Sequence, residues 1–245
     1  MNPDFVAVFW KEWKEILLER ASGGSGLRPL IMVGLIGVVI PLRLDAQRYF
    51  SPRPLLGLIF VSLAAVLAVV PDAFAGERER HTLETLLASR LPDRAILFGK
   101  LAACLGYGWL LSIITIILGI ITANAKNWNG HVLLYRDTAS WLCLILLPPL
   151  VGGAVASAGV FVSLRAATVR QAQQTLMFAL VAVVLGVSLG SGALPENVRM
   201  WFARILATWS GAQLVLAASA VVLAVDLVLI LAAVSCFQRS KLVLD

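Results

Sequence analysis

The chain has 245 residues, of which 60% are hydrophobic and only 14% are charged. Its mean hydropathy of +0.89 lies far above that of soluble globular domains and predicts an integral membrane protein. The net charge of +6 requires no nucleic-acid partner, because basic cytoplasmic loops facing anionic lipid account for it.

The first twenty residues predict an amphipathic helix. Charged residues interrupt this stretch, so it lacks the apolar core of a signal peptide. One side of the helix carries Phe5, Phe9, Trp13, Ile16 and Leu17. Such a helix lies in the membrane interface, either as a simple anchor or as an elbow that braces a cytoplasmic partner. The glycine- and serine-rich stretch 22–26 then predicts a flexible turn, so residues 1–26 form a helix and hinge.

Six apolar windows follow, each a candidate for a helix that crosses the membrane. They are Pro29–Leu42, Pro54–Pro71, Leu101–Ala125, Thr138–Leu164, Gln171–Glu196 and Ile205–Gln238. The first window is short, so a re-entrant or tilted element competes with a full span there. The long windows are continuously apolar and therefore predict helices rather than strands. We expect an all-α integral membrane protein, a single domain 1–245 with a six-span bundle at 27–245.

The distribution of lysine and arginine predicts how the chain is oriented. With the N-terminus inside, 13 of the 20 basic residues fall in cytoplasmic segments. Both termini are therefore expected in the cytoplasm.

The segment Gly76–Lys100 is a charged interruption between two apolar windows. Residues 77–89 predict a short cytoplasmic helix made of good helix formers. Its apolar face carries Leu83, Leu86 and Leu87. Pro92 ends this helix and Asp93 suits the positive N-terminal end of the next one. A segment patterned in this way predicts a docking surface, and a solvated connector is the alternative.

Outside this segment, the sequence has few motifs typical of catalytic or metal-binding sites. The sequence has no phosphate-binding loop, no nucleophile elbow and no zinc-protease motif. His81 and His131 fall in loops on opposite sides, which argues against a shared metal site. Asp226 interrupts the last window near its middle, where an ionised carboxylate is costly. It is either a functional site or a carboxyl group that is protonated or paired inside the bundle.

The segment Glu77–Leu87, together with Ile96–Lys100, resembles the membrane subunits of ABC-2 type ATP-binding-cassette exporters. The family pattern is E-R-x-x-G-T-L-E-x-L-L followed by I-L-x-G-K, and His81 stands here where glycine is usual. A weaker match at 169–174 is similar to sodium-exporter-like members, with Gln171 where glutamate is usual. The length, the N-terminal helix and the six predicted spans extend the resemblance to the whole chain.

The resemblance implies that the loop after the second span is a coupling helix that docks into a separate ATPase subunit. The coupling residues would be Glu77, Arg78, Glu79, Thr82, Leu83, Glu84, Leu86 and Leu87. ATP and magnesium would bind to that partner, and this chain would hold no cofactor, no metal and no catalytic residue. The other expected partners are a second copy or homologue of the chain and the lipid of a bacterial or archaeal plasma membrane.

The resemblance also implies an extracellular re-entrant hairpin within 190–211, before the last span. Its candidate gate residues are Trp201, Phe202 and Trp209, and an ordinary amphipathic loop is the alternative. The expected function is that of a permease subunit of an exporter. Two other classes remain: a transporter or channel driven by an ion gradient, with Asp226 as the ion site, and a non-transporting membrane scaffold.

Overall fold

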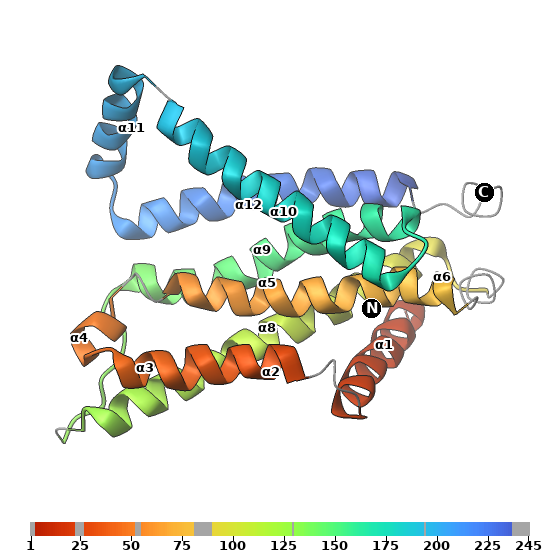
Figure 1. Cartoon of the computed structure of the whole chain (residues 1–245), viewed down its shortest axis with the longest axis horizontal. Helices are drawn as coiled ribbons and strands as arrows, with labels where there is room; N and C mark the ends of the chain where they lie inside the picture. The colour runs from red at the N-terminus through yellow and green to blue at the C-terminus, as the bar shows by residue number, and fades with distance from the viewer. Residues whose placement is uncertain are drawn as a thin grey trace.

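A computed structural model of the chain describes residues 3–22, 27–51, 55–80, 90–128, 130–193 and 195–236. Within these ranges the regular secondary structure is helical and no strand occurs. Figure 1 shows long helices lying side by side, with a shorter N-terminal helix running across one end of them. The predicted all-α class is therefore confirmed for the described part of the chain.

Five helical stretches in the described residues are long and apolar enough to cross a membrane. They are Ile59–Glu79, Asp93–Lys126, Thr138–Arg165, Val169–Gly190 and Gly211–Ser235. These stretches correspond to the second to sixth predicted windows. Asp226 does not interrupt the last one, because α12 (Gly211–Cys236) continues through it.

The first predicted window is helical but short. It consists of α2 (Leu27–Gly34), the π-helical turn η2 (Leu35–Val39) and α3 (Ile40–Arg43) in direct succession. The apolar helix Pro29–Arg43 is roughly 22 Å long at 1.5 Å per residue, against a hydrocarbon core of about 30 Å. Its full crossing, and with it the count of six spans, stays a prediction.

The core of the bundle surrounds α5 (Leu55–Pro71), which packs against α8 (Asp93–Lys126) and α9 (Thr138–Arg165). Val66 and Val70 of α5 are fully buried there. On its other side α9 packs against α12. Ser62 of α5 donates a 2.9 Å hydrogen bond to the carbonyl oxygen of Pro148, so a polar contact joins α5 to α9 inside this core.

Figure 1 also shows α10 (Val169–Ala193) running obliquely to α5 and α9, so that its two ends have different surroundings. Near its start, Ala172 and Leu176 are buried. Farther along, Phe178, Val187 and Leu189 are each at least 69% exposed. From Phe178 onward, α10 therefore presents exposed apolar side chains to the surroundings of the bundle.

The two ends of the bundle differ in structure. At one end, which we call the α4 end, α4 (Ala46–Tyr49) lies near the loop 130–137, and Tyr49 and Tyr135 have ring centroids 6.3 Å apart. Asn124 fixes that loop by exchanging two hydrogen bonds with the backbone of Leu133. Helix α11 (Glu196–Thr208) lies at the same end and leads into α12. The re-entrant course expected for 190–211 stays a prediction.

At the opposite end, which we call the α6 end, the helix α1 (Pro3–Ser22) packs against α8. The predicted N-terminal helix is confirmed, and its expected apolar face is confirmed in part, because Ile16 is buried and Phe9 and Trp13 pack against the core. Val8, Glu12 and Ile16 are buried, whereas Leu17 is 42% exposed. A spacing of four residues puts these three side chains in one row, and the middle one is a carboxylate.

The charged segment does not begin as a separate helix. Helix α5 continues through the π-helical turn η3 (Asp72–Gly76) into α6 (Glu77–Glu79), and a turn follows at Arg80. The wider turn comes directly after Pro71, which has no N–H to donate to the helix. The end of the segment agrees with expectation, since Pro92 is the N-cap of α8 and Asp93 its first residue.

Candidate functional site

Residues Asp72–Arg80 connect the second candidate span to the charged segment, and we call them the junction segment. They comprise η3, α6 and the turn at Arg80, whose guanidinium lies 3.4 Å from the carboxylate of Asp72. Within this segment Glu77, Arg78 and Glu79 have partners on four different helices. Single π-helical turns inside α-helices occur frequently at functional sites, and η3 is such a turn between α5 and α6.

Glu77 points inward and takes part in a buried ion cluster. Its Oε1 lies 2.9 Å from Nζ of Lys100 in α8 and 3.6 Å from Nζ of Lys11 in α1. The Lys100 ammonium also lies 2.8 Å from Oε1 of Glu12 and donates to the carbonyl oxygen of Ala73 at 2.9 Å. All three N–H donors of this lysine therefore have acceptors. We call Lys11, Glu12, Glu77 and Lys100 the charge cluster.

Burial makes the pairing within this cluster energetically important. The side chain of Lys100 is 1% exposed, and those of Glu12 and Glu77 are 5% and 11% exposed. An ammonium in such a place is costly unless opposite charges and hydrogen bonds compensate for the lost water. Here two carboxylates provide that compensation, and the ring of Phe74 lies 5.8 Å from the ammonium. The three buried charges depend on one another.

Lys11 forms the solvent-facing side of the cluster, with 52% of its side chain exposed. Burial alone would lower the pKa of Lys11, but the carboxylates of Glu12, Glu15 and Glu77 outweigh it and raise the pKa above the ordinary value of 10.5. A raised lysine pKa means that the folded state holds the proton more tightly. The stabilisation is therefore complete below pH 10.5 and is lost as the pH rises through the folded-state pKa. Lys11 stays charged at neutral pH.

Arg78 and Glu79 contact the turn that connects α9 to α10. Nη1 of Arg78 donates to the carbonyl oxygen of Leu164, in the last turn of α9, at 2.7 Å. The backbone N–H of Val169, the first residue of α10, donates to Oε2 of Glu79 at 3.0 Å. Consecutive residues of α6 thus hold the end of one helix and the start of the next.

The junction segment is therefore attached to α1, α8, α9 and α10, and it continues α5 without a break. Such an attachment suits the transmission of a displacement, because a push on the segment acts on several helices at once. The contacts are ion pairs and hydrogen bonds between side chains and helix ends. They are the means by which a mechanical contact outside the membrane would reach the helices inside it.

The predicted coupling residues fall in two groups. Glu77, Arg78 and Glu79 belong to the junction segment, and the structure gives each of them an internal partner. Thr82, Leu83, Glu84, Leu86 and Leu87 lie outside the described residues. The buried position of Glu77 favours a role within this chain rather than in contact with another protein.

Sequence reasoning did not identify Glu12 and Lys100 as a pair. Lys100 was predicted only as a cytoplasmic basic residue and as the last residue of the I-L-x-G-K pattern, and Glu12 was one of the charged residues that interrupt the first twenty. A signal existed in each case. Glu12 lies four residues from both Val8 and Ile16, on an otherwise apolar row, and Lys100 directly precedes a long apolar window.

The predicted gate residues lie far along the chain and at the other end of the bundle. Trp201 of α11 is 58% exposed, and Trp209, in the connection to α12, is 44% exposed. The side chain of Phe202 lies outside the described part of the structure. Exposed aromatic rings are typical of a membrane interface.

Asp226 is buried between α12 and α9. The residue is 5% exposed, and its Oδ1 has no hydrogen-bond partner among the described residues. The other oxygen, Oδ2, lies where a side chain on Gly153 would begin, since a Cβ built on that glycine would be 2.8 Å away. The absence of a side chain at Gly153 therefore makes room for the carboxyl group.

We expect Asp226→Asn to be tolerated and Gly153→Val to be harmful. Asparagine keeps the shape of the carboxyl group without a charge, whereas valine would overlap with it and cost about 1–3 kcal/mol by overpacking. Thermal unfolding of the detergent-solubilised variants measures both effects. A large loss of stability in Asp226→Asn would instead indicate that an ionised carboxylate is required at this position.

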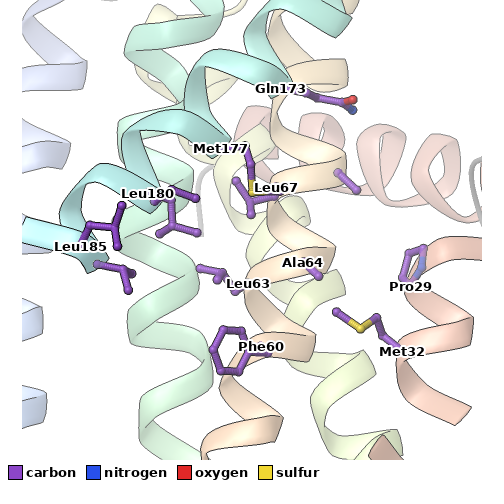
Figure 2. Close-up of a pocket in the computed structure, with 13 residues that line it drawn as sticks. Pro29, Met32, Phe60, Leu63, Ala64, Leu67, Gln173, Met177, Leu180 and Leu185 are labelled. Carbon is purple, nitrogen blue, oxygen red and sulfur yellow. The ribbon is translucent and has the colours of Figure 1, made fainter. Parts of the chain in front are cut away.

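A second structural feature is an apolar groove of about 540 Å³ between α2, α5 and α10. Figure 2 shows side chains of all three helices pointing into it. The labelled residues include Met32, Phe60, Leu63, Leu67, Met177 and Leu180. Gln173, near the start of α10, is the one polar side chain among the lining residues. A groove of this composition suits an apolar occupant.

Comparison with known protein families identifies the class of this molecule. Residues 3–216 match the sequence profile of the ABC-2 type transporter family. The chain belongs to this family. As an ABC-2 family member with several membrane-spanning helices, it is a multi-pass membrane protein and a transport component. No curated protein sequence matches it in a direct comparison.

Members of the ABC-2 family normally work with an ABC ATPase partner. The matched region includes the N-terminal helix, the junction segment and the start of α12. The charge cluster and the contacts of Arg78 and Glu79 therefore lie within the family region.

Proposed function

We propose that this chain is the permease subunit of an ATP-driven exporter and that residues 77–89 couple it to a separate ATPase subunit. The observation that carries the proposal is the attachment of the junction segment to α1, α8, α9 and α10. A partner that moves residues 81–89 would pull on all of these helices through Glu77, Arg78 and Glu79. A simple solvated connector would have no need of such contacts.

In this proposal the α6 end faces the cytoplasm and the α4 end faces the outside. The excess of lysine and arginine in the segments assigned to the α6 end supports this orientation. The bundle has six spans, with Pro29–Arg43 as a short first span whose flanking arginines extend its reach to the headgroups. The membrane is a bacterial or archaeal plasma membrane.

The roles of the subunits follow from the same proposal. ATP and magnesium bind to the ATPase, and this chain carries out no catalysis. Two copies, or this chain and a homologue, enclose the pathway. The exposed apolar surface of α10 and the adjoining groove supply area for that association. Trp201, Phe202 and Trp209 line the outer mouth, in a hairpin that dips into the membrane.

Co-purification from membranes tests the proposal. The chain is expressed with a tag in cells of its source organism, where its natural partners are present, and it is isolated from the membranes through that tag. We expect the ATPase to co-purify and to hydrolyse ATP in the complex. Absence of any ABC ATPase from the purified material, with the chain itself intact, would contradict the proposal.

A transporter driven by an ion gradient is the second candidate. The carboxyl group of Asp226 favours it, because it is buried and one of its oxygens has no hydrogen-bond partner in the part of the chain that the structure describes. This alternative predicts ion-dependent transport in proteoliposomes that contain the chain alone. An ATP-driven exporter predicts no transport under those conditions.

A further inference from the structure

The two halves of the family pattern meet in space. Glu77 begins the E-R-x-x segment and Lys100 ends the I-L-x-G-K segment, and their side chains form a 2.9 Å ion pair. The third member, Glu12, comes from outside the pattern and lies 2.8 Å from the same ammonium. One lysine therefore links α8, the junction segment and α1.

The residue before Lys100 brings α1 close enough for this link. A Cβ built on Gly99 would lie 2.7 Å from Cγ1 of Val8 and 3.2 Å from the backbone nitrogen of Phe9. Any other residue at position 99 would push α1 away from α8. Gly99 thus permits the close approach, and Lys100 supplies the charge that pairs with Glu12 on the same face of α1.

We propose that Lys100 is a positioning residue that makes α1 and the junction segment move together when the ATPase acts. The inference rests on the proposed function, because the movement would originate in the partner subunit. Helix α1 is then a part of the coupling apparatus rather than a simple interfacial anchor. The buried, three-way pairing of Lys100 favours this role, since its ammonium lies 2.8 Å from Glu12 of α1 and 2.9 Å from Glu77, whereas the direct contact of α1 with Glu77, through the half-exposed Lys11, is longer at 3.6 Å.

The first test uses the chain alone in lipid nanodiscs. The triple variant Glu12→Gln, Glu77→Gln, Lys100→Met removes all buried charge from the cluster and leaves no ion without a partner, so the fold is expected to remain. Hydrogen exchange of the α1 amides is expected to become about tenfold faster or more, with α9 and α12 unchanged. Lys14→Gln, which changes an exposed lysine of the same helix, is the matched control and should behave as the wild type.

The second test measures movement in the complex with the ATPase. Spin labels at Trp10→Cys on α1 and Leu231→Cys on α12, both exposed positions, report the distance between these helices in a background without the native cysteines. In the otherwise wild-type chain the distance is expected to change when ATP is added. In the triple variant the ATPase is expected to remain bound, while the ATP-dependent change in this distance is lost.

The outcomes separate this inference from the proposed function. Unchanged α1 exchange in the triple variant, or an ATP response equal to that of the wild type, would overturn the positioning role of Lys100. A wild-type chain that binds its ATPase without any movement of α1 would also overturn it. A failure of the chain to bind an ABC ATPase would contradict the proposed function, whatever the exchange experiment gives.

Discussion

Lys100→Met alone is expected to destabilise the protein strongly, by about 3–5 kcal/mol. Methionine removes the ammonium but leaves the carboxylates of Glu12 and Glu77 facing each other in a buried place. Each would lose its short ion pair, and the two negative charges would repel. Breaking a buried ion pair by removing one partner is far more costly than replacing the whole group with neutral residues.

Thermal unfolding of the solubilised chain measures this effect. For a chain of this size, a loss of that magnitude corresponds to a fall in Tm of roughly 10 °C, at about 2–4 °C per kcal/mol. Adding Glu12→Gln and Glu77→Gln to Lys100→Met is expected to restore much of the lost stability. A Tm for Lys100→Met within one or two degrees of the wild type, taken as about the error of such a measurement, would show that the buried charges do not depend on one another.

The second large effect is expected from Leu86→Asp, which should abolish co-purification of the ATPase. Leu83, Leu86 and Leu87 share one face of the helix predicted for residues 77–89, and a charge there would have to be desolvated at the contact. An apolar anchor at the centre of an interface typically accounts for much of its affinity. Glu84→Lys should act in the same direction by reversing a charge that favours the partner.

Thr85→Asp is the matched control for this experiment. It adds the same charge to the same segment, but on the opposite face of the predicted helix. We expect the control to retain the ATPase and all variants to reach the membrane in normal amounts. Equal binding by Leu86→Asp and the wild type would show that this face does not contact the ATPase.

Sequence patterns predicted the long helices well because length and apolarity determine them. The start of α8 was also predictable, since Pro92 and Asp93 have strong positional preferences at a helix N-terminus. The continuation of α5 through Asp72–Gly76 was not. A π-helical turn depends on how neighbouring helices pack, and the charges after Pro71 favoured a boundary that the chain does not have.

The charge cluster shows the main limit of reasoning from the sequence. Glu12, Glu77 and Lys100 are far apart in the chain, and each has an ordinary local explanation as a charge beside a membrane. Only the packing of α1 on α8 brings Glu12 close to Lys100. The burial of Asp226 could be predicted, because this residue lies in the middle of an apolar window. Its contact with Gly153 could not be predicted from the sequence.

The order of the two charges at positions 78 and 79 of α6 agrees with the dipoles of the helices that they contact. The last carbonyl groups of α9 form the negative end of a helix dipole, and the first N–H groups of α10 form the positive end of another. Arg78 meets the former and Glu79 meets the latter, so each side chain complements the dipole that it faces. Exchanging the two residues would oppose both dipoles at once. The order arginine then glutamate therefore fits the end of α9 followed by the start of α10, and the reverse order would not.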